Sequence, residues 1–379
     1  CDPEGGVFGR DANRRLDGTA AESAAEAIFR AIPRADRDVM VRSLRETIAD
    51  CAKIGMTAAV EAAVGFTSGF DEELAVWKAL RRTDEVLPMR LGFMYQLDPA
   101  EAGVRGLVPE FDPNWQGATL KFFADGIVGA RTAAVSVDYC DVPSRGFFLR
   151  AEGELNRVIV EAHRAGWQVA VHAVGDRAIS ETISAYEEAQ RTAHREDPRH
   201  RIEHFFCPPA DGFARMRELG ALVVMQPSFL TRTRRSIDEA FGARAHQYYP
   251  GRSAICAGVQ YIASSDAPTG SVSPWAGMAS AIDRGASGGE PLGVAEALTA
   301  REAVSSYIRG AYAMRQETWR STLEPGMAAD LIVLDRDPFG ESILSLRETN
   351  VLMTMVRGEI CHNTLSDRLS HAGKWHWRA

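Results

Sequence analysis

The feature that most constrains the fold is an alternation of short apolar runs with amphipathic helical segments. Seven apolar runs have the character of strands that are buried on both faces. These strand candidates are 56–64, 89–96, 119–123, 168–172, 201–205, 221–226 and 259–264. Helical periodicity is found over 36–54, 71–82, 154–165, 178–192, 211–219, 236–245 and 299–315. Such alternation predicts an α/β fold with parallel strands and right-handed crossovers.

The number of strand candidates points to a barrel that is short of one strand. Seven strand–helix units are one fewer than the eight that close a (β/α)8 TIM barrel. We therefore expect a TIM barrel in which strand one is missing. An open, doubly wound sheet is the structural alternative. No Gly-x-Gly-x-x-Gly motif follows any strand candidate, so a dinucleotide site has no support.

The two ends of the chain do not follow the strand–helix pattern. Residues 1–37 are polar and rich in Gly and Ala, and we expect a loop followed by a short helix. Beyond the last helix, a turn at 324–326 and apolar runs at 329–334 and 351–357 favour a small β layer, with Gly358 in a hairpin turn. This predicts two domains, a barrel over 1–318 and a C-terminal β segment over 319–379. The C-terminal tail is polar, and we interpret four of its side chains as surface packing and not as ligands: His371, Trp375, His376 and Trp377.

The composition is that of an ordinary globular protein with a large core. The chain has 379 residues, of which 45% are hydrophobic and 25% are charged. A net charge of −8 argues against a nucleic-acid partner. The six cysteines include no Cys-x-x-Cys pair, which fits reduced thiols in a cytoplasm. No stretch approaches the roughly 18 apolar residues of a membrane span and no signal peptide is visible, so we expect a cytoplasmic protein without a membrane partner.

Ligand-type side chains stand at the ends of four strand candidates. These residues are Lys121, His172, His204 and Asp266. The carboxyl ends of barrel strands share one face, which is where TIM-barrel enzymes keep their chemistry. Imidazole nitrogen and carboxylate oxygen are ligands of catalytic Zn²⁺, and water on such an ion ionises near pH ~7. Asp266 could take the proton from that water and return it to a leaving amine.

Each of these residues also has a purely structural interpretation. An unpaired buried ammonium is costly, so Lys121 could pair with an acid such as Asp125. His204 follows Glu203, and strand alternation would turn only one of the two toward the core. Asp266 precedes an Ala-Pro pair and could form an Asx turn or cap a helix. The remaining histidines before the C-terminal β segment are expected to be structural, namely His163, His194, His200 and His246.

Six segments resemble the amidohydrolase superfamily, in particular the amidohydrolase-3 or YtcJ-like branch that includes N-substituted formamide deformylases. They occur in the family's order and are spread over most of the chain. The segments are LKFFADGIVGARTAA (120–134), VHAVGDRAI (171–179), RIEHF (201–205), VVMQPSF (223–229), SSDAP (264–268) and PGMAADLIVLDRDP (325–338). The resemblance implies a metal-dependent hydrolase on a TIM barrel, with a β-sandwich assembled from both chain ends.

The resemblance also implies roles for individual residues. His172 and His204 would be metal ligands after strands five and six, and Asp266 would be the strand-eight ligand and the general base. Lys121, after strand four, would be the carboxylated lysine that bridges two metals in related branches. Carboxylation would convert an awkward buried ammonium into an anionic ligand. Further candidates, for contacts with substrate or for support of the ligands, lie in the loops after strands: Asp125, Arg131 and Gln226.

The chain departs from the family at the first barrel strand. In the family that strand ends in His-x-His, whereas here no such motif precedes Lys121 and the first histidine is His163. The chain also begins with Cys1 in place of Met. These observations predict either a fragment of a longer enzyme or a shortened relative with an incomplete metal site.

The leading hypothesis is a metal-dependent amidohydrolase. It would cleave a non-peptide C–N bond of the amide or formamide type by attack of metal-activated water, with one or two divalent ions, zinc being favoured. One alternative is a catalytically inactive barrel with a binding or structural role. Another is a hydrolase of the same superfamily that acts on an ester or deaminates a ring. A small-molecule substrate is expected, and a homo-oligomer is compatible with the sequence.

Overall fold

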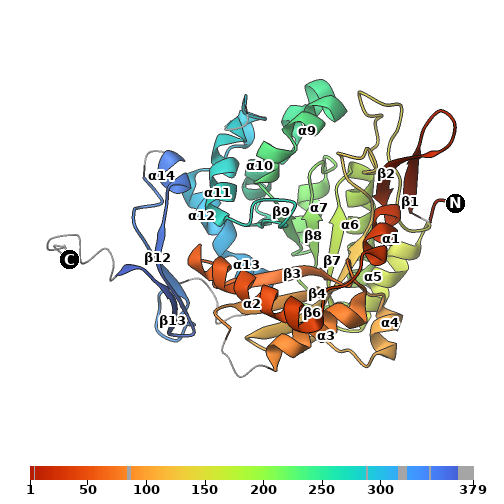
Figure 1. Cartoon of the computed structure of the whole chain (residues 1–379). Helices are drawn as coiled ribbons and strands as arrows, with labels where there is room; N and C mark the ends of the chain where they lie inside the picture. Colours follow the sequence, from red (N-terminus) through yellow and green to blue (C-terminus); the bar gives the residue numbers. More distant parts are fainter. Residues whose placement is uncertain (4, 83–86, 287–288, 315–321, 341–342, 366–379) are drawn as a thin grey trace.

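Parallel strands form one curled sheet at the centre of the molecule (Figure 1). The computed structural model describes residues 1–3, 5–82, 87–286, 289–314, 322–340 and 343–365. The sheet has the order β10-β9-β8-β7-β6-β4-β3, and all of these strands are parallel to their neighbours. Their bounds are β3 (Ala58–Val64), β4 (Arg90–Tyr95), β6 (Trp115–Phe123), β7 (Gln168–Ala173), β8 (Arg201–His204), β9 (Leu222–Met225) and β10 (Gln260–Ala263). A two-residue strand, β5 (Glu110–Phe111), pairs with β6 in the antiparallel sense.

This topology is that of a barrel that does not close. Strands follow each other in chain order without a reversal, so the doubly wound alternative is wrong. All seven predicted strands are confirmed. Among the described residues, no strand pairs with both β3 and β10, and the short helix α13 (Gly310–Ala313) contacts both of these edges. The described residues therefore form a seven-stranded half-barrel and not a complete (β/α)8 barrel.

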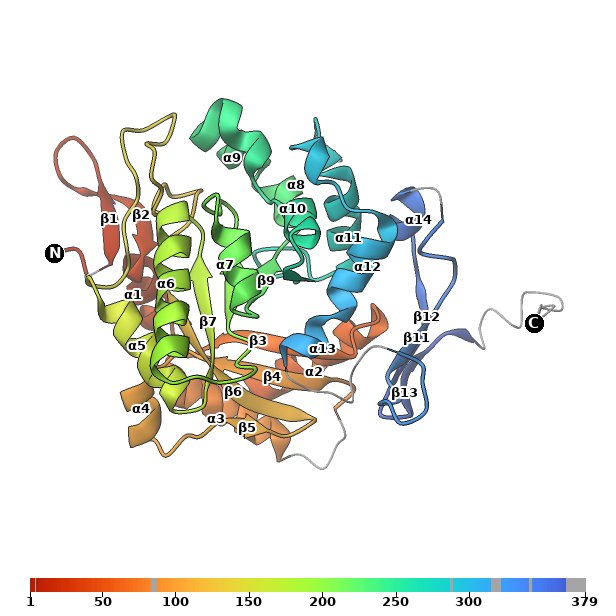
Figure 2. The same cartoon turned by 180° about the vertical axis from the view of Figure 1, so that it is seen from behind.

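Helices cover the outer face of the sheet, and Figure 2 shows α5, α6 and α7 side by side over β7. The spacing of apolar residues within the helices explains why they lie on the sheet. In α5, for example, the apolar residues at i, i+3, i+4 and i+7 form one buried stripe: Leu155, Val158, Ile159 and Ala162. The helical elements of this layer and of the connections are α2 (Arg37–Lys53), α3 (Phe70–Arg81), α4 (Pro99–Val104), α5 (Glu154–Arg164), α6 (Asp176–Thr192), α7 (Gly212–Glu218), α8 (Phe229–Arg232), α9 (Arg234–Phe241), η1 (Gly242–Gln247), α10 (Gly251–Cys256), α11 (Pro274–Asp283), η3 (Val294–Glu296) and α12 (Ala300–Ile308).

The predicted helices are confirmed, with two differences in detail. The segment predicted over 236–245 is α9 followed by the 3₁₀ turn η1. The segment predicted over 299–315 is divided into α12 and α13 at Arg309, and its last residue lies outside the described residues.

Residues 6–31 form a hairpin and a helix. Strands β1 (Gly6–Arg10) and β2 (Leu16–Glu22) pair in the antiparallel sense, and α1 (Ser23–Ala31) follows directly. The short helix is confirmed, but the expectation of a loop before it is wrong. The sequence lacked a strand signal because the hairpin buries little, and Leu16, for example, is 66% exposed.

The C-terminal β layer is confirmed as an antiparallel sheet of β11 (Leu331–Leu334), β12 (Val351–Val356) and β13 (Glu359–Asn363). The Thr354 hydroxyl donates to the carbonyl of Ala52 in α2 at 2.7 Å, which joins this sheet to the barrel layer. The hairpin β1–β2 lies at the opposite end of the molecule (Figure 1), so the described residues do not build one sandwich from both chain ends. Helix α14 (Ile343–Arg347) precedes β12. The predicted domain boundary at 318/319 and the tail residues His371, Trp375, His376 and Trp377 lie outside the described residues.

None of the helices in the described ranges is both long enough and apolar enough to cross a membrane.

Candidate functional site

The rings of His172 and His204 lie together at the carboxyl end of the sheet. Their centroids are 4.4 Å apart, and both side chains are buried. In the β7–β8 register His172 is opposite Glu203 and Ala173 is opposite His204. Strict alternation would therefore place Glu203, and not His204, on the face of His172. The backbone of His204 has a φ of 78°, which ends the alternation and brings its ring to His172. The expectation that only one of the two neighbours is directed into the core is therefore wrong.

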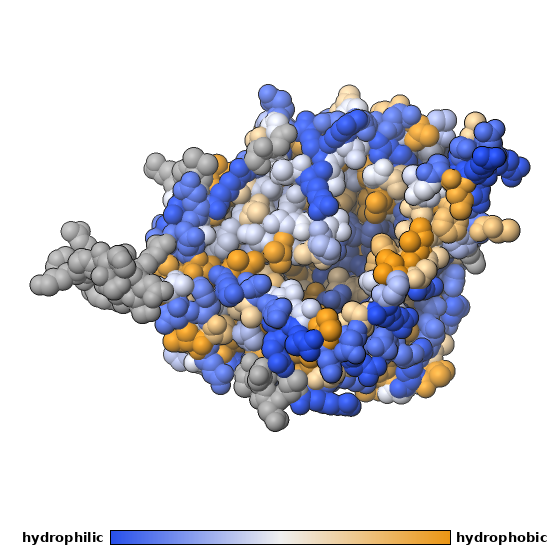
Figure 3. Space-filling view, in the orientation of Figure 1, coloured by the Kyte–Doolittle hydropathy of each residue, from blue (hydrophilic) through white to orange (hydrophobic). Residues whose placement is uncertain are grey.

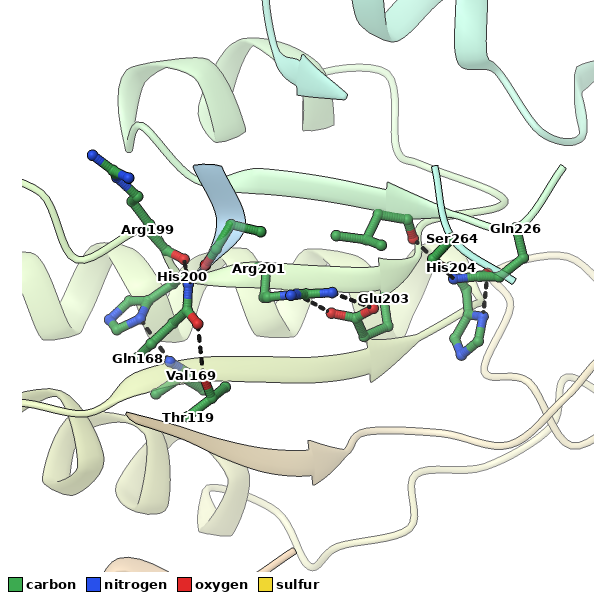
Figure 4. Close-up of polar contacts among 12 residues, drawn as sticks. Thr119, Gln168, Val169, Arg199, His200, Arg201, Glu203, His204, Gln226 and Ser264 are labelled. Atoms are coloured by element: carbon green, nitrogen blue, oxygen red, sulfur yellow. Dashed lines mark hydrogen bonds and ion pairs between the residues drawn. The ribbon is translucent and has the colours of Figure 1, made fainter. Parts of the chain in front are cut away.

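A hydrogen bond to Gln226 orients the His204 ring (Figure 4). The Nδ1 atom of His204 is 2.7 Å from Oε1 of Gln226. The amide group of Gln226 is itself oriented, because its Nε2 donates to the hydroxyl of Ser264 at 3.0 Å. The Gln226 oxygen therefore accepts, Nδ1 of His204 carries the proton, and Nε2 of His204 is left with its lone pair. Gln226 is thus hydrogen-bonded to one of the predicted metal ligands, and its supporting role stays a prediction.

His172 is oriented by the backbone of the loop after β6. Its Nε2 donates to the carbonyl of Gly126 at 3.1 Å, which leaves the Nδ1 lone pair for another partner. Burial, reinforced by His204 and Lys121, lowers the pKa of His172 well below its ordinary value. Burial also lowers the pKa of His204 to about 3. Both rings are therefore neutral at pH 7, which is the form that binds metal.

Asp125 connects the loops that follow β6 and β7. Its carboxylate accepts from the backbone amides of Ala134 at 2.8 Å, Val174 at 3.0 Å and Gly175 at 2.9 Å. Burial raises the pKa of Asp125 to about 7, although these three amides favour the ionised form. The pairing of Lys121 with Asp125 that was one alternative is wrong, since the oxygens of Asp125 are engaged by backbone. Asp125 thus fixes the start of the loop that also carries the Gly126 carbonyl.

The ammonium of Lys121 is buried in the half-barrel next to the ring of Phe123, with Nζ 5.1 Å from the ring centroid. Within the described part of the chain, no carboxylate lies within 4 Å of this nitrogen. Burial lowers the pKa of Lys121, and the negative charges of Glu203 and Asp266 oppose that shift only partly. The lysine is thus a buried amine without an ion-pair partner among the described residues.

Asp266 follows β10 in a tight turn, with a φ of 50°. None of the described residues donates a hydrogen bond to its carboxylate, so the Asx-turn and helix-cap alternatives are not what this structure contains. Burial raises the pKa of Asp266, and the positive charge of Lys121 opposes that shift. A carboxylate without a structural hydrogen bond is available for proton transfer.

Two acids close to these residues were not selected from the sequence. Glu203 pairs with Arg201 at 2.5 Å inside the half-barrel (Figure 4), and its charge acts on both Lys121 and His172. Glu61 on β3 has a pKa raised by burial and, to a smaller extent, by the charges of Glu73 and Asp266. The sequence did contain a signal for Glu61, because it is the single acid in an otherwise apolar strand. Such an acid is expected to face a polar interior.

Arg131 is engaged in the loop that follows β6. Its Nε donates to both carboxylate oxygens of Asp141 at 2.9 and 3.0 Å, and its Nη1 donates to the carbonyl of Val128 at 2.6 Å. These hydrogen bonds occupy the guanidinium group and stabilise the loop. Arg131 would have to break some of them in order to contact a substrate.

The donors in the described residues fit a metal ion only in part. His172 and His204 each retain one ring nitrogen without a protein hydrogen bond. Across the described ranges, however, no three or more His, Cys, Asp and Glu side chains are grouped so that they could hold a metal ion. Catalytic zinc sites use three protein ligands. Among the predicted site residues, the further donors are Lys121 in carboxylated form and Asp266.

Comparison with known proteins agrees with the fold. The chain is 26% identical over 367 residues to the protein YtcJ of Bacillus subtilis (strain 168), covering 95% of this chain and 68% of that protein. It is 29% identical over 375 residues to an N-substituted formamide deformylase of Arthrobacter pascens, covering 94% and 67%. A solved structure, an uncharacterized metal-dependent hydrolase from Pyrococcus horikoshii, is 25% identical with a TM-score of 0.67, covering 80% of this chain and 61% of that one.

The chain thus spans about two thirds of the length of these relatives. The description of the matching family model is "Amidohydrolase family", and the match extends over residues 1–362. The resemblance predicted from the six sequence segments is confirmed, and the chain belongs to the amidohydrolase family.

Proposed function

We propose that this chain supports the hydrolysis of a non-peptide C–N bond of the amide or formamide type in a small molecule. The observation that carries the proposal is the neutral pair of His172 and His204, 4.4 Å apart, with the unbonded carboxylate of Asp266 at the same end of the sheet. The relative that is an N-substituted formamide deformylase supports the bond type. The metal-dependent hydrolase with a similar fold supports a divalent metal, and imidazole donors favour zinc.

The residues have distinct roles in this proposal. A divalent metal, when bound, lowers the pKa of a water to near ~7 and so supplies hydroxide at neutral pH. His172 through Nδ1 and His204 through Nε2 would hold it, with Lys121 as its carbamate and Asp266 as further ligands. Asp266 takes the proton from the attacking water and delivers it to the departing amine, which leaves as a neutral molecule. Gln226 and the Gly126 carbonyl keep the two imidazoles in the required tautomers.

A second candidate is a barrel without catalytic activity that binds a small molecule or has a structural role. The observation that favours it is that the described residues provide no group of three His, Cys, Asp and Glu side chains for a metal ion. Catalysis by two ligands alone would be weak, because the metal would be lost readily.

Metal analysis of the purified 379-residue chain, combined with assays on simple formamides and N-acyl amines, separates the two candidates. After equilibration with zinc and gel filtration, we expect about one bound equivalent or more in the wild type, and loss of most of it in His204→Ala. His246→Ala is the matched control, because His246 is exposed and lies in η1. Fewer than about 0.2 equivalents in the wild type, without hydrolysis, would favour the inactive barrel.

A further inference from the structure

A line of three phenylalanine rings leads from the candidate site to the surface. The ring of Phe123 is 5.3 Å from that of His172, and Phe66 is stacked on Phe123 at 5.8 Å with an interplanar angle of 27°. The ring of Phe29 follows at 6.5 Å from Phe66. The three residues come from β6, from the loop after β3 and from α1, so the tertiary fold brings them together.

The outermost ring of this line is exposed. Phe123 and Phe66 are partly buried, whereas Phe29 is 40% exposed. The aromatic group on the other side of the site is different: Phe206 and Phe229, which contact His204, are both buried. The buried group is core packing, whereas the line from Phe123 to Phe29 remains accessible to a ligand.

The molecular surface has a hollow above the middle of the sheet, with hydrophobic residues along its side next to α1 (Figure 3). Helix α1 exposes two large apolar side chains, Ile28 and Phe29, and Ile32 directly after the helix is also exposed, although Ala24 in α1 is fully buried. Exposed apolar side chains that are grouped beside a hollow indicate a binding surface. Because Phe29 is also the outer end of the line of three rings, these side chains extend the part of the candidate site that lies next to Phe123.

The loop that carries Phe66 is held in place by one carboxylate. Glu73 in α3 accepts from the backbone amides of Gly65, Thr67 and Ser68, at 2.5, 2.9 and 2.5 Å. The bonded amides therefore belong to residues immediately before and after Phe66 in the sequence. A loop fixed in this way presents its ring in one position, which reduces the entropy lost when a ligand binds.

We propose that Phe29, Phe66 and Phe123 form an apolar subsite that binds an aromatic substituent of the amide substrate. The proposal rests on the proposed function, since His172 at the inner end of the ring line marks where the scissile amide would lie. Aromatic ligands stack on such rings in offset or edge-to-face geometry, and that contact favours them over small alkyl analogues. The subsite therefore defines the substrate class as amides with an aryl-bearing substituent.

Binding and turnover are measured separately to test this subsite. Calorimetric titration of the 379-residue chain with phenylacetamide and with acetamide is expected to show at least tenfold tighter binding of the aryl amide, roughly the effect of one or two ring contacts. Phe66→Leu is expected to lose most of this preference. Glu73→Gln keeps the ring but weakens its support, and it is expected to lower the preference by about threefold. Phe111→Leu is the matched control, because Phe111 is 46% exposed but lies on β5.

The outcomes distinguish the subsite from the reaction. Equal affinity for the two amides, or an unchanged preference in Phe66→Leu, overturns the subsite. Turnover is then compared for N-(2-phenylethyl)formamide and N-methylformamide, where kcat/KM is expected to favour the aryl substrate by at least tenfold. A wild type that keeps the binding preference but hydrolyses neither formamide overturns the proposed reaction and leaves the aryl subsite supported.

Discussion

The Nδ1 atom of His204 lies 2.7 Å from Oε1 of Gln226, and this hydrogen bond determines which nitrogen of the imidazole is left for a ligand. Ser264 receives a hydrogen bond from the other end of the same amide, so the Gln226 side chain has one orientation. The tautomer of His204 is thus set by a residue on the neighbouring strand end.

Replacing Gln226 by leucine should weaken the site while leaving its ligands in place. Without an acceptor, the His204 ring loses both its orientation and its tautomer preference, and supporting residues of this kind contribute about 10-fold to 100-fold to metal affinity or activity. Competition of the chain with a chromophoric zinc chelator measures the loss. Gln226→Glu keeps an acceptor for Nδ1 and is expected to retain most of the affinity. Equal loss in both variants would contradict an orienting role.

Lys121 is expected to be carboxylated when the site is filled. Its nitrogen has no acidic partner within 4 Å among the described residues, and burial favours the neutral amine. Reaction of this neutral amine with CO₂ forms an N–C bond, releases one proton and produces an anion. Native mass spectrometry of protein kept in bicarbonate should show one added CO₂ that is absent in Lys121→Met. An unmodified lysine, together with full hydrolytic activity of Lys121→Ala, would exclude this role.

A buried pair of histidines under the site should make stability depend on pH. The amide of Val169 donates to Nδ1 of His200 at 3.0 Å, so the proton of His200 is on Nε2 (Figure 4). That Nε2 is 2.8 Å from Nδ1 of His163, whose Nε2 then donates to the carbonyl of Ala193 at 2.5 Å. These hydrogen bonds engage the ring nitrogens in their neutral form, so an added proton would have to displace one of them.

The sign of the pH effect follows from the burial of this pair. Burial lowers the pKa of His163 below its ordinary value, so the unfolded chain binds more protons than the folded one. The contribution of His163 to stability is complete above pH ~6.5 and declines as the pH falls, by at most about 1.4 kcal/mol per pH unit. Urea unfolding of wild type and His163→Gln at pH 8 and pH 5 should show a difference in free energy that shrinks at the lower pH. The exposed variant His246→Gln should follow the wild-type profile, and a constant difference for His163→Gln would refute the model.

A buried ion pair connects the barrel to the C-terminal sheet. The Nε of Arg90, at the start of β4, is 2.6 Å from Asp330, the residue before β11, and the Asp330 side chain is only 14% exposed. Asp330→Ala leaves the guanidinium without this partner, and we expect a loss of about 3 kcal/mol in the free energy of unfolding. Asp50→Ala, which removes an exposed pair with Lys53, should cost less than about 0.5 kcal/mol. Similar effects of the two substitutions in urea unfolding would show that Arg90 and Asp330 do not couple the two parts.

The central sheet could be predicted from local patterns, whereas the chain ends could not. Strands such as β7 are buried on both faces, so almost every residue must be apolar and the run is visible in the sequence. The hairpin β1–β2 is mostly exposed, and its residues therefore carry no comparable signal. A sandwich that would join both chain ends was expected from the family resemblance, and it is absent from the described residues because β1–β2 and β11–β13 lie at opposite ends.

The sequence by itself determined the order of the strands and the chemistry at their ends, because an apolar run that stops at His172, His204 or Asp266 places that residue at the carboxyl edge of a parallel sheet. Only the tertiary structure decided how these residues meet. The left-handed backbone at His204, the acceptor supplied by Gln226 and the lack of a carboxylate within 4 Å of Lys121 among the described residues depend on segments far apart in the chain. The same holds for the line from Phe123 to Phe29, because contacts between distant elements leave no periodicity in the sequence.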